Sequence, residues 1–411
     1  MRLDGRLGAL AERNYRLVFA SSTVSSLGDG VAAIALVFAV LDISGSPASI
    51  GIVLACRQAA AAAVTLAAGV WADRLPRHLV LVAAAVVLGT VQAIAGGLLV
   101  SGHASVAVLA VLGAIYGAAD GFVLPASQGL IPAVVSAARL QEGNALLGLS
   151  RSALSLIAPA LGGILVTLGS PGSAILVDAA SFAVAAVLLL RVAIDANADQ
   201  VAPEPFLREL REGWNAFRRQ TWIWTTIVFF GIGNFAGASL FVLGPVVAKR
   251  YLGGVWTWSV LVSAFGAGTI IGGLLALRWR PKRPLLASCV AAIPYGSQTL
   301  AMGLHLPWQA LVVVSFVTGI GLSIHLALWF TVFQQQVPTE HLSRVSSYDA
   351  LGSFVLIPVG SALAGPVASL IGIFPTLVAS GLISLACIAI VIGQPSVRAI
   401  RAAPTPEPLP A

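Results

Sequence analysis

Five charged residues stand inside long apolar runs of the sequence, where water cannot solvate them: Asp29, Arg57, Asp120, Arg151 and Asp178. Charges at such positions are costly, usually paired and usually functional. Burial and a neighbouring Arg shift the pKa of a carboxyl group in opposite directions. These residue types can therefore bind and release a proton, and proton handling is the chemistry that the pattern predicts.

Apolar runs of membrane-span length set the positions of these charges. Hydrophobic residues make up 58% of the 411 residues and charged residues only 9%, whereas a soluble protein carries about 25% charged residues. Runs of this length cross a bilayer as helices, and they lack the short alternation of barrel strands. We therefore expect an all-α integral membrane protein with twelve transmembrane helices, near 15–40, 48–71, 78–100, 104–129, 144–168, 172–192, 222–247, 255–277, 284–304, 308–334, 343–369 and 373–393.

The distribution of Lys and Arg predicts the orientation of the chain. Cytoplasmic loops carry the excess of basic residues in membrane proteins. Of the 23 Lys and Arg residues, only Lys249 and Arg250 fall in the loops of one side, and Arg57 and Arg151 fall within spans. We expect both termini in the cytoplasm, in a multi-pass protein of the cell (inner) membrane.

Depth along the spans predicts which charges meet. Asp29 and Arg57 lie about 11 and 9 residues from the outer ends of their spans, or ~16 and ~13 Å at the helical rise. Asp120 and Arg151 lie about 9 and 7 residues from the inner ends, or ~13 and ~11 Å. This predicts two pairs, Asp29–Arg57 and Asp120–Arg151, and leaves Asp178 without an obvious basic partner. Asp29 is the preferred proton-coupling residue and Asp120 the second choice; the alternative is purely structural ion pairs.

The chain divides into two halves of six spans. We expect an N-terminal half at 1–192, a central cytoplasmic loop with an amphipathic helix at 193–220, a C-terminal half at 221–393 and a disordered cytoplasmic tail at 394–411. Gly69 and Gly273, at corresponding places in the halves, are each followed five residues later by Arg. Parallel repeats of six spans are a known transporter architecture.

The second half offers polar groups in place of deep acidic residues. Asn234, His325 and Asp349 are its polar side chains near or within the spans, and aromatic residues accompany them. We expect a mainly apolar substrate cavity there, with Asn234, Phe235, His325 and Trp329 as candidate lining residues. For His325, helix packing is the alternative to a role in proton transfer.

The stretch Gly69-x-x-x-Asp73-Arg74-x-x-Arg77-His78 resembles the loop motif of the major facilitator superfamily, with His78 in place of the final Arg. It follows the second span on the predicted inner side, as in that family, and the resemblance covers essentially the whole chain. The resemblance implies that Asp73 contacts the start of span eleven, near His341–Arg344, and that this contact locks the outward-facing state. The alternative is a charge cluster that only sets topology.

Within that superfamily, the sequence is similar to the twelve-span drug:proton antiporters, above all to the branch of macrolide-efflux and enterobactin-exporter proteins. Arg13–Arg16, Leu27–Asp29 and Leu176–Phe182 carry this resemblance. In span five, Ala158-Pro159-Ala-Leu-Gly162-Gly163 resembles the antiporter motif G-P-x-x-G-G, with Ala158 at its first Gly. For Pro159, Gly162 and Gly163, close helix packing is an equal alternative to a transport role.

Several motifs are missing from the sequence. There is no GxxxxGK[ST] phosphate loop and no HExxH or Cys/His ligand spacing, so we expect neither ATP-driven transport nor enzyme activity, and no metal or cofactor. No basic stripe is long enough for nucleic acid. The expected partners are a small-molecule substrate, protons and membrane lipids, and the family default is a monomer.

The sequence thus predicts a secondary active transporter that works by alternating access. Its expected activity is proton-coupled efflux of amphipathic small organic molecules, such as a drug, antibiotic, natural product or siderophore. The alternative is a proton-coupled importer (symporter) of a small solute in the same superfamily.

Overall fold

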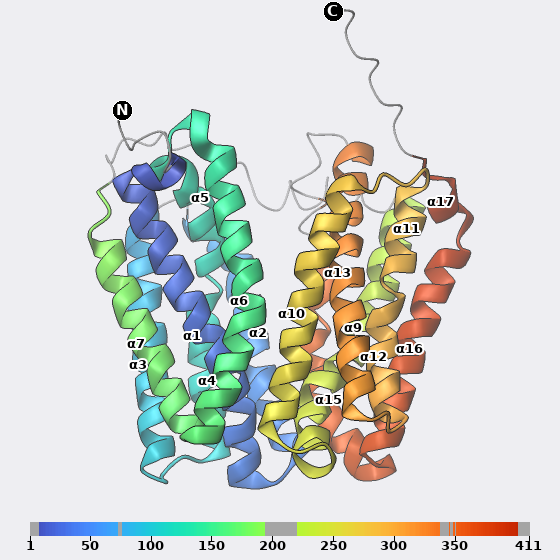
Figure 1. The fold of residues 1–411 in the computed structure, drawn as a ribbon, viewed down its shortest axis with the longest axis horizontal. Helices are drawn as coiled ribbons and strands as arrows, with labels where there is room; N and C mark the ends of the chain where they lie inside the picture. The colour runs from blue at the N-terminus through green and yellow to red at the C-terminus, as the bar shows by residue number, and fades with distance from the viewer. Residues whose placement is uncertain are drawn as a thin grey trace, which may run out of the picture. The chain divides into compact units, whose positions relative to one another are not determined.

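The structure is a computed structural model that describes residues 8–72, 76–193, 220–337, 345, 348–349 and 351–401. These residues form helices and no strand (Figure 1). Within them, twelve helical spans are long and apolar enough to cross a membrane, which confirms the predicted fold class. The helices are η2 (Gly8–Ala11), α1 (Arg13–Ser44), α2 (Pro47–Ala72), α3 (Arg77–Val100), α4 (Val106–Asp120), α5 (Val123–Val134), η3 (Ala137–Arg139), α6 (Leu140–Leu168), α7 (Pro171–Leu190), α9 (Thr221–Tyr251), α10 (Val255–Arg278), α11 (Pro284–Ala291), α12 (Ile293–Gly303), α13 (Trp308–Gln336), α15 (Ile357–Ile371), α16 (Ile373–Gly393) and α17 (Pro395–Ala399).

Three of the described spans are interrupted, which the sequence analysis did not predict. The eleventh has a turn at residues 355–356, just before α15. The fourth span breaks between α4 and α5, directly after Asp120. A Cβ atom on Gly121 would lie 2.9 Å from the Ala61 carbonyl oxygen, so α2 packs closely against this break. The ninth span breaks between α11 and α12, just before Pro294, which has no N–H to continue the helical ladder.

The turn between α1 and α2 is short because its residues favour it. Gly45 ends α1 with a positive φ of 63°, and its N–H donates to the Leu41 carbonyl at 2.9 Å. Glycine is the residue that adopts this left-handed cap most readily. Pro47 then begins α2, where its fixed φ suits the first turn.

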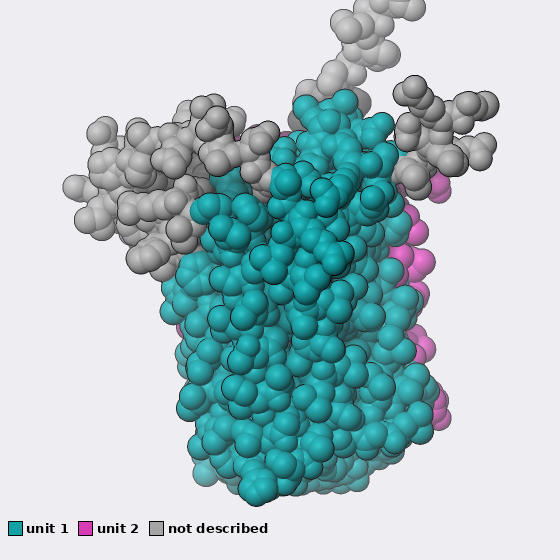
Figure 2. All heavy atoms as spheres, turned by 90° about the vertical axis from the view of Figure 1, so that its left-hand side faces the viewer, with its two compact units in different colours: residues 1–202, 238–267, 358–373 teal, residues 203–237, 268–357, 374–411 magenta. Residues whose placement is uncertain are grey.

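The chain forms two compact units. Unit 1 comprises residues 1–202, 238–267 and 358–373, and unit 2 comprises 203–237, 268–357 and 374–411. Within unit 1, α3 and α1 pack against α7, α1 packs against α6, and α2 packs against α4; within unit 2, α11 and α12 pack against α13. Figure 2 shows the packed atoms of unit 1 in teal.

The boundaries of unit 1 differ from the predicted boundary of the N-terminal half. Segments of α9, α10 and α15 belong to unit 1 because small residues let them approach the first six spans. A Cβ atom on Gly51 would lie 2.2 Å from the Ser361 carbonyl oxygen, and one on Gly365 would lie 2.2 Å from the Ala48 Cα. Gly266 makes a similar approach to the Ser155 carbonyl, also at 2.2 Å.

Large apolar side chains cover the surface of the spans. Leu168 and Leu370 are each 84% exposed, and many other Leu, Ile and Val side chains are more than a third exposed. A water-facing protein would not expose so many, so these faces suit contact with lipid.

Part of the predicted tail is ordered. Residues 394–401 are described, α17 begins at Pro395, and Val397 is fully buried in a cluster of unit 2 that includes Leu285 and Val391. The prediction that disorder begins at residue 394 is therefore wrong, because Val397 has an apolar site to fill. The amphipathic helix predicted within 193–220 lies outside the described residues.

Candidate functional site

A cavity in unit 1, which we call the carboxylate cavity, brings three of the five predicted intramembrane charges together. It has a volume of about 350 Å³, and Asp29, Asp120 and Arg151 line it. Asp29 comes from the middle of α1, Asp120 from the end of α4 and Arg151 from α6. Four serines of α1 share the lining: Ser21, Ser22, Ser25 and Ser26.

The predicted ion pair between Asp29 and Arg57 is wrong as a direct contact. Within the described part of the chain, no ion pair within 4.0 Å joins these residues. Instead, Tyr116 lies between them: its hydroxyl donates to the Asp29 carboxylate, and the Arg57 guanidinium carbon lies 3.9 Å from the centre of its ring. The link is a hydrogen bond followed by a cation–π contact.

Asp178 lies outside the lining of the carboxylate cavity and is completely buried. The Gln92 Nε2 donates to its Oδ2 at 2.5 Å, and the Ser181 hydroxyl donates to its Oδ1 at 3.2 Å. A Cβ atom on Gly28 would lie 2.3 Å from Asp178 Oδ1, so α1 passes directly over this carboxylate. Neutral donors take the place of the basic partner that the sequence did not offer.

The second predicted pair, Asp120 and Arg151, does not form an ion pair either. Asp120 and Arg151 line the same cavity, but no ion pair between them occurs among the residues that the structure describes. The Arg151 charge thus faces the cavity together with two carboxylates.

The loop motif is only partly described. Gly69 lies in α2, while Asp73, Arg74 and the expected contact near His341–Arg344 lie outside the described residues. Arg77 is the first residue of α3, and its Nη1 donates to the Gly129 carbonyl at 2.8 Å. This bond joins the start of α3 to α5.

The antiporter-like motif makes packing contacts on α6. Pro159, Gly162 and Gly163 are all buried. A Cβ atom on Gly162 would lie 3.0 Å from the Val31 carbonyl oxygen, and one on Gly163 would lie 2.4 Å from the Ser259 hydroxyl. The two glycines therefore allow close approach of α1 and of the part of α10 that belongs to unit 1.

A second cavity, which we call the aromatic cavity, lies entirely in unit 2 and measures about 240 Å³. Asn234, His325 and Trp329, which the sequence analysis proposed, all line it. Phe235 is not part of the lining, although it was expected there; Phe229 and Phe230 on α9 are. The other lining residues are Thr226, Ile227, Gly233, Ala292, Tyr295, Leu322, Leu326, Phe330, Asp349, Ser353, Phe354, Ile357, Ser384 and Ile388.

Hydrogen bonds fix the polar groups of the aromatic cavity. The Trp329 Nε1 donates to Asp349 Oδ2 at 3.1 Å, and the Ser353 hydroxyl donates to Asp349 Oδ1 at 3.2 Å. The Asn234 Nδ2 donates to the Ser353 carbonyl at 2.9 Å. These bonds join α9 and α13 to the segment that carries Asp349.

Contacts with neighbouring side chains fix the position of the His325 ring. Its ring stacks on Phe230 at a centroid distance of 4.6 Å and an angle of 5°, and its Nδ1 lies 2.9 Å from the Ser288 hydroxyl. These contacts support the packing role that stood as the alternative for this residue.

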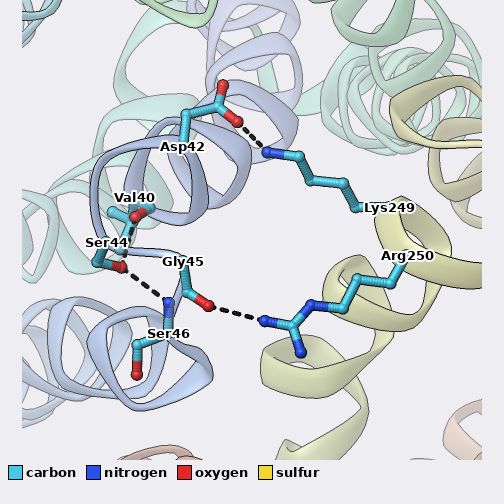
Figure 3. Close-up of polar contacts among 7 residues, drawn as sticks. All are labelled: Val40, Asp42, Ser44, Gly45, Ser46, Lys249 and Arg250. Atoms are coloured by element: carbon cyan, nitrogen blue, oxygen red, sulfur yellow. Dashed lines mark hydrogen bonds and ion pairs between the residues drawn. The ribbon is translucent and has the colours of Figure 1, made fainter.

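A third group of contacts joins the α1–α2 turn to the end of α9, all within unit 1 (Figure 3). The Lys249 ammonium pairs with the Asp42 carboxylate, and the Arg250 Nη2 donates to the Gly45 carbonyl at 2.9 Å. Lys249 and Arg250 are the two basic residues that the charge distribution assigns to the outer loops. A positive charge at the carboxyl end of α1 also suits the helix dipole.

No group of three or more His, Cys, Asp or Glu side chains within the described residues could hold a metal ion. The three cysteines are free thiols.

Comparison with known proteins decides the family. The model of the Major Facilitator Superfamily matches residues 18–303. The chain belongs to the major facilitator superfamily. Membership confirms the resemblance found in the sequence, and because this is a family of transporters, the protein is a multi-pass membrane transporter and not an enzyme.

Relatives place this major facilitator protein near known efflux proteins. It is 24% identical to macrolide efflux protein A of Streptococcus pyogenes over 398 residues, which cover 94% of this chain and 96% of that protein. It is also 24% identical to the uncharacterized MFS-type transporter YvqJ of Bacillus subtilis, over 64% of each chain. The alignment with YvqJ thus spans less than two thirds of that relative.

Solved structures share the fold. A POT family transporter crystallised with a thioalcohol-conjugated peptide aligns with a TM-score of 0.73 at 11% identity, covering 93% of this chain and 96% of that one. A bacterial homolog of the human lysosomal transporter Spinster aligns with a TM-score of 0.69 at 15% identity, covering 96% and 99%. At these identities the likeness concerns the fold alone.

Proposed function

We propose that this major facilitator protein exports amphipathic small organic molecules by alternating access, driven by the proton gradient. The observation that carries the proposal is the aromatic cavity, whose walls are mostly apolar side chains with a few fixed polar groups. Such a lining suits a molecule that is largely apolar and carries few polar groups. The similarity to macrolide efflux protein A supports export of this class of substrate.

The carboxylate cavity supports proton coupling. Asp29 and Asp120 line this cavity together with Arg151 and serine side chains, and ionisable residues at membrane depth commonly serve as proton relays. Asp29 is the preferred coupling residue because its carboxylate accepts a hydrogen bond from the Tyr116 hydroxyl and interacts electrostatically with the Arg57 charge. One elementary charge that crosses a potential of 100 mV supplies about 2.3 kcal/mol.

Accumulation of a lipophilic dye in bacteria that lack their own efflux pumps tests this proposal. Cells that express the protein should accumulate less of a lipophilic dye than control cells, and a protonophore should abolish the difference. Equal accumulation, or higher accumulation in expressing cells, would contradict export, and the latter would favour the importer.

The coupling residue is tested by Asp29→Asn. This change keeps the size of the side chain and its acceptor for Tyr116, but it removes the titratable proton. We expect proton-driven efflux to fall to about the background, because a coupling residue cannot be replaced by a neutral amide. Ser22→Ala, in the same cavity but without a titratable group, is the matched control and should retain efflux. Full proton-driven efflux by Asp29→Asn would exclude Asp29 as the coupling residue.

A further inference from the structure

We propose that Asp349 recognises the positive charge of an amphipathic organic cation that binds in the aromatic cavity. This inference rests on the proposed export of amphipathic molecules and narrows its substrate class. It follows from three features of unit 2: the composition of the cavity wall, the surroundings of the Asp349 carboxylate and the size of the cavity.

The wall of the aromatic cavity has one carboxylate and many rings. Among the described residues that line it, Asp349 is the only Asp or Glu, and no Lys or Arg is present. The aromatic lining residues are Phe229, Phe230, Tyr295, Trp329, Phe330 and Phe354. The faces of such rings attract organic cations. The rings and the carboxylate therefore both favour a positively charged ligand.

Among the residues that the structure describes, the Asp349 carboxylate accepts hydrogen bonds from neutral donors. Its two donors, the Trp329 indole and the Ser353 hydroxyl, are both neutral. No ion pair to Asp349 occurs among the described residues. A carboxylate in apolar surroundings is costly unless it is paired, and a cation bound among the aromatic rings would pair with it.

The position of this carboxylate is fixed in advance. Each of its oxygens accepts one hydrogen bond, and Asn234 holds the Ser353 backbone from α9 at 2.9 Å. A group held in this way loses little conformational entropy when a ligand binds, which favours affinity. The Asp349 carboxylate is therefore pre-organised, as expected for a ligand-binding group.

The size of the cavity limits what enters it. A volume of about 240 Å³ is below the range of roughly 300–1,000 Å³ that holds whole drug-sized ligands. The cavity therefore takes the end of a larger molecule that carries the amine, or the whole of a small aryl ammonium ion. The remaining body of a large substrate would lie outside this cavity.

The competing explanation is that Asp349 serves only as a hydrogen-bond acceptor that joins α13 to the segment before α15. Asp349→Asn separates the two explanations, because an amide oxygen still accepts a hydrogen bond but the charge is lost. Asp349→Glu keeps the charge and is the conservative variant. Size-exclusion profiles of both variants would verify that they remain folded.

The experiment measures binding to the full chain in lipid nanodiscs by equilibrium dialysis, with empty nanodiscs as the blank. The probes are benzyltrimethylammonium and its neutral isostere neopentylbenzene, in which a carbon replaces the nitrogen. We expect Asp349→Asn to weaken binding of the cation by roughly tenfold or more, equal to about 1.4 kcal/mol. Binding of the neutral isostere should not change, and Asp349→Glu should bind the cation more tightly than Asp349→Asn.

Equal cation affinity in the wild type and in Asp349→Asn would overturn the proposal, as would equal loss of the cation and of the neutral isostere. Failure of the proposed export has a different signature. If Asp349 binds the cation but no dye is expelled in a protonophore-sensitive way, the binding site stands and export fails. If efflux is proton-driven but the affinity for the cation does not depend on Asp349, the proposed export stands and this inference fails.

Discussion

At the scale of single residues, the buried carboxylates of this protein are held mainly by neutral donors. Asp29 accepts from Tyr116, Asp178 from Gln92 and Ser181, and Asp349 from Trp329 and Ser353. A hydrogen bond steadies a carboxylate without cancelling its charge. The charge of Asp29 and of Asp349, which line cavities, therefore stays available to a proton or a cationic ligand, which a tight salt bridge would prevent.

The bond from Gln92 to Asp178 makes a stability prediction. Gln92→Leu fills a similar volume but leaves Asp178 Oδ2 without its donor in a fully buried site. An unsatisfied buried acceptor costs about 1–3 kcal/mol, and more when it is charged. We expect a lower melting temperature in detergent, measured by thiol-reactive dye or scanning fluorimetry.

Thr90→Val is the matched control for this change, because Thr90 lies on the same helix and its hydroxyl bonds only to the Val86 carbonyl at an exposed site. It should leave the melting temperature nearly unchanged. If Gln92→Leu is as stable as this control, the Gln92–Asp178 bond does not hold α3 to α7 as the structure implies.

The same residues mark how far the sequence could predict the site. Depth arithmetic predicted an Asp29–Arg57 pair and a separate Asp120–Arg151 pair. The structure instead places Asp29, Asp120 and Arg151 in the lining of one cavity. Depth arithmetic gave no rotation about each helix axis, so it paired Asp29 directly with Arg57, whereas Tyr116 lies between them. It offered no partner for Asp178, and Gln92 is the one that the structure shows. Tyr116 lies one helical turn before Asp120, and that spacing is the signal that could have identified it.

At the scale of elements, the spans were predictable because an apolar run of this length has few alternatives to a membrane helix. The break after Asp120 was not predictable, because glycine is common in membrane helices and Gly121 alone does not signal an interruption. Only the close packing of α2 against Gly121 in the structure reveals it. The ordered α17 was missed for a related reason, since one buried Val397 leaves no periodic pattern in a five-residue helix.

The contact between α1 and α9 makes a prediction at this scale. Lys249 and Asp42 are 39% and 50% exposed, and exposed pairs contribute only about 0–1 kcal/mol. The pair is therefore weak enough to open during each transport cycle. If export works by alternating access, a covalent bridge between α1 and α9 at this point should stop it.

The test places cysteines at Asp42 and Lys249 in a chain whose own three cysteines are replaced, and joins them with a short bifunctional methanethiosulfonate. Dye efflux should fall to about the background and return after reduction. Each single-cysteine variant, treated in the same way, is the control. Undiminished efflux by the cross-linked protein would show that this contact does not open during transport.

At the scale of the whole molecule, the distribution of charge predicts the orientation in the membrane. Cytoplasmic loops carry the excess of Lys and Arg in membrane proteins, and the sequence assigns only Lys249 and Arg250 to the predicted outer side. The structure places both in the last turn of α9. The structure gives these two an additional role, because both contact the carboxyl end of α1. Their presence on the sparsely charged side is thus explained by a contact, and it does not argue against the predicted orientation.

Labelling of single cysteines in intact cells tests that orientation. Lys249→Cys, next to the α1–α2 turn, should react with a membrane-impermeant maleimide added outside. Arg278→Cys, at the opposite end of α10, should react only after the cells are permeabilised. The reverse pattern would place the termini outside.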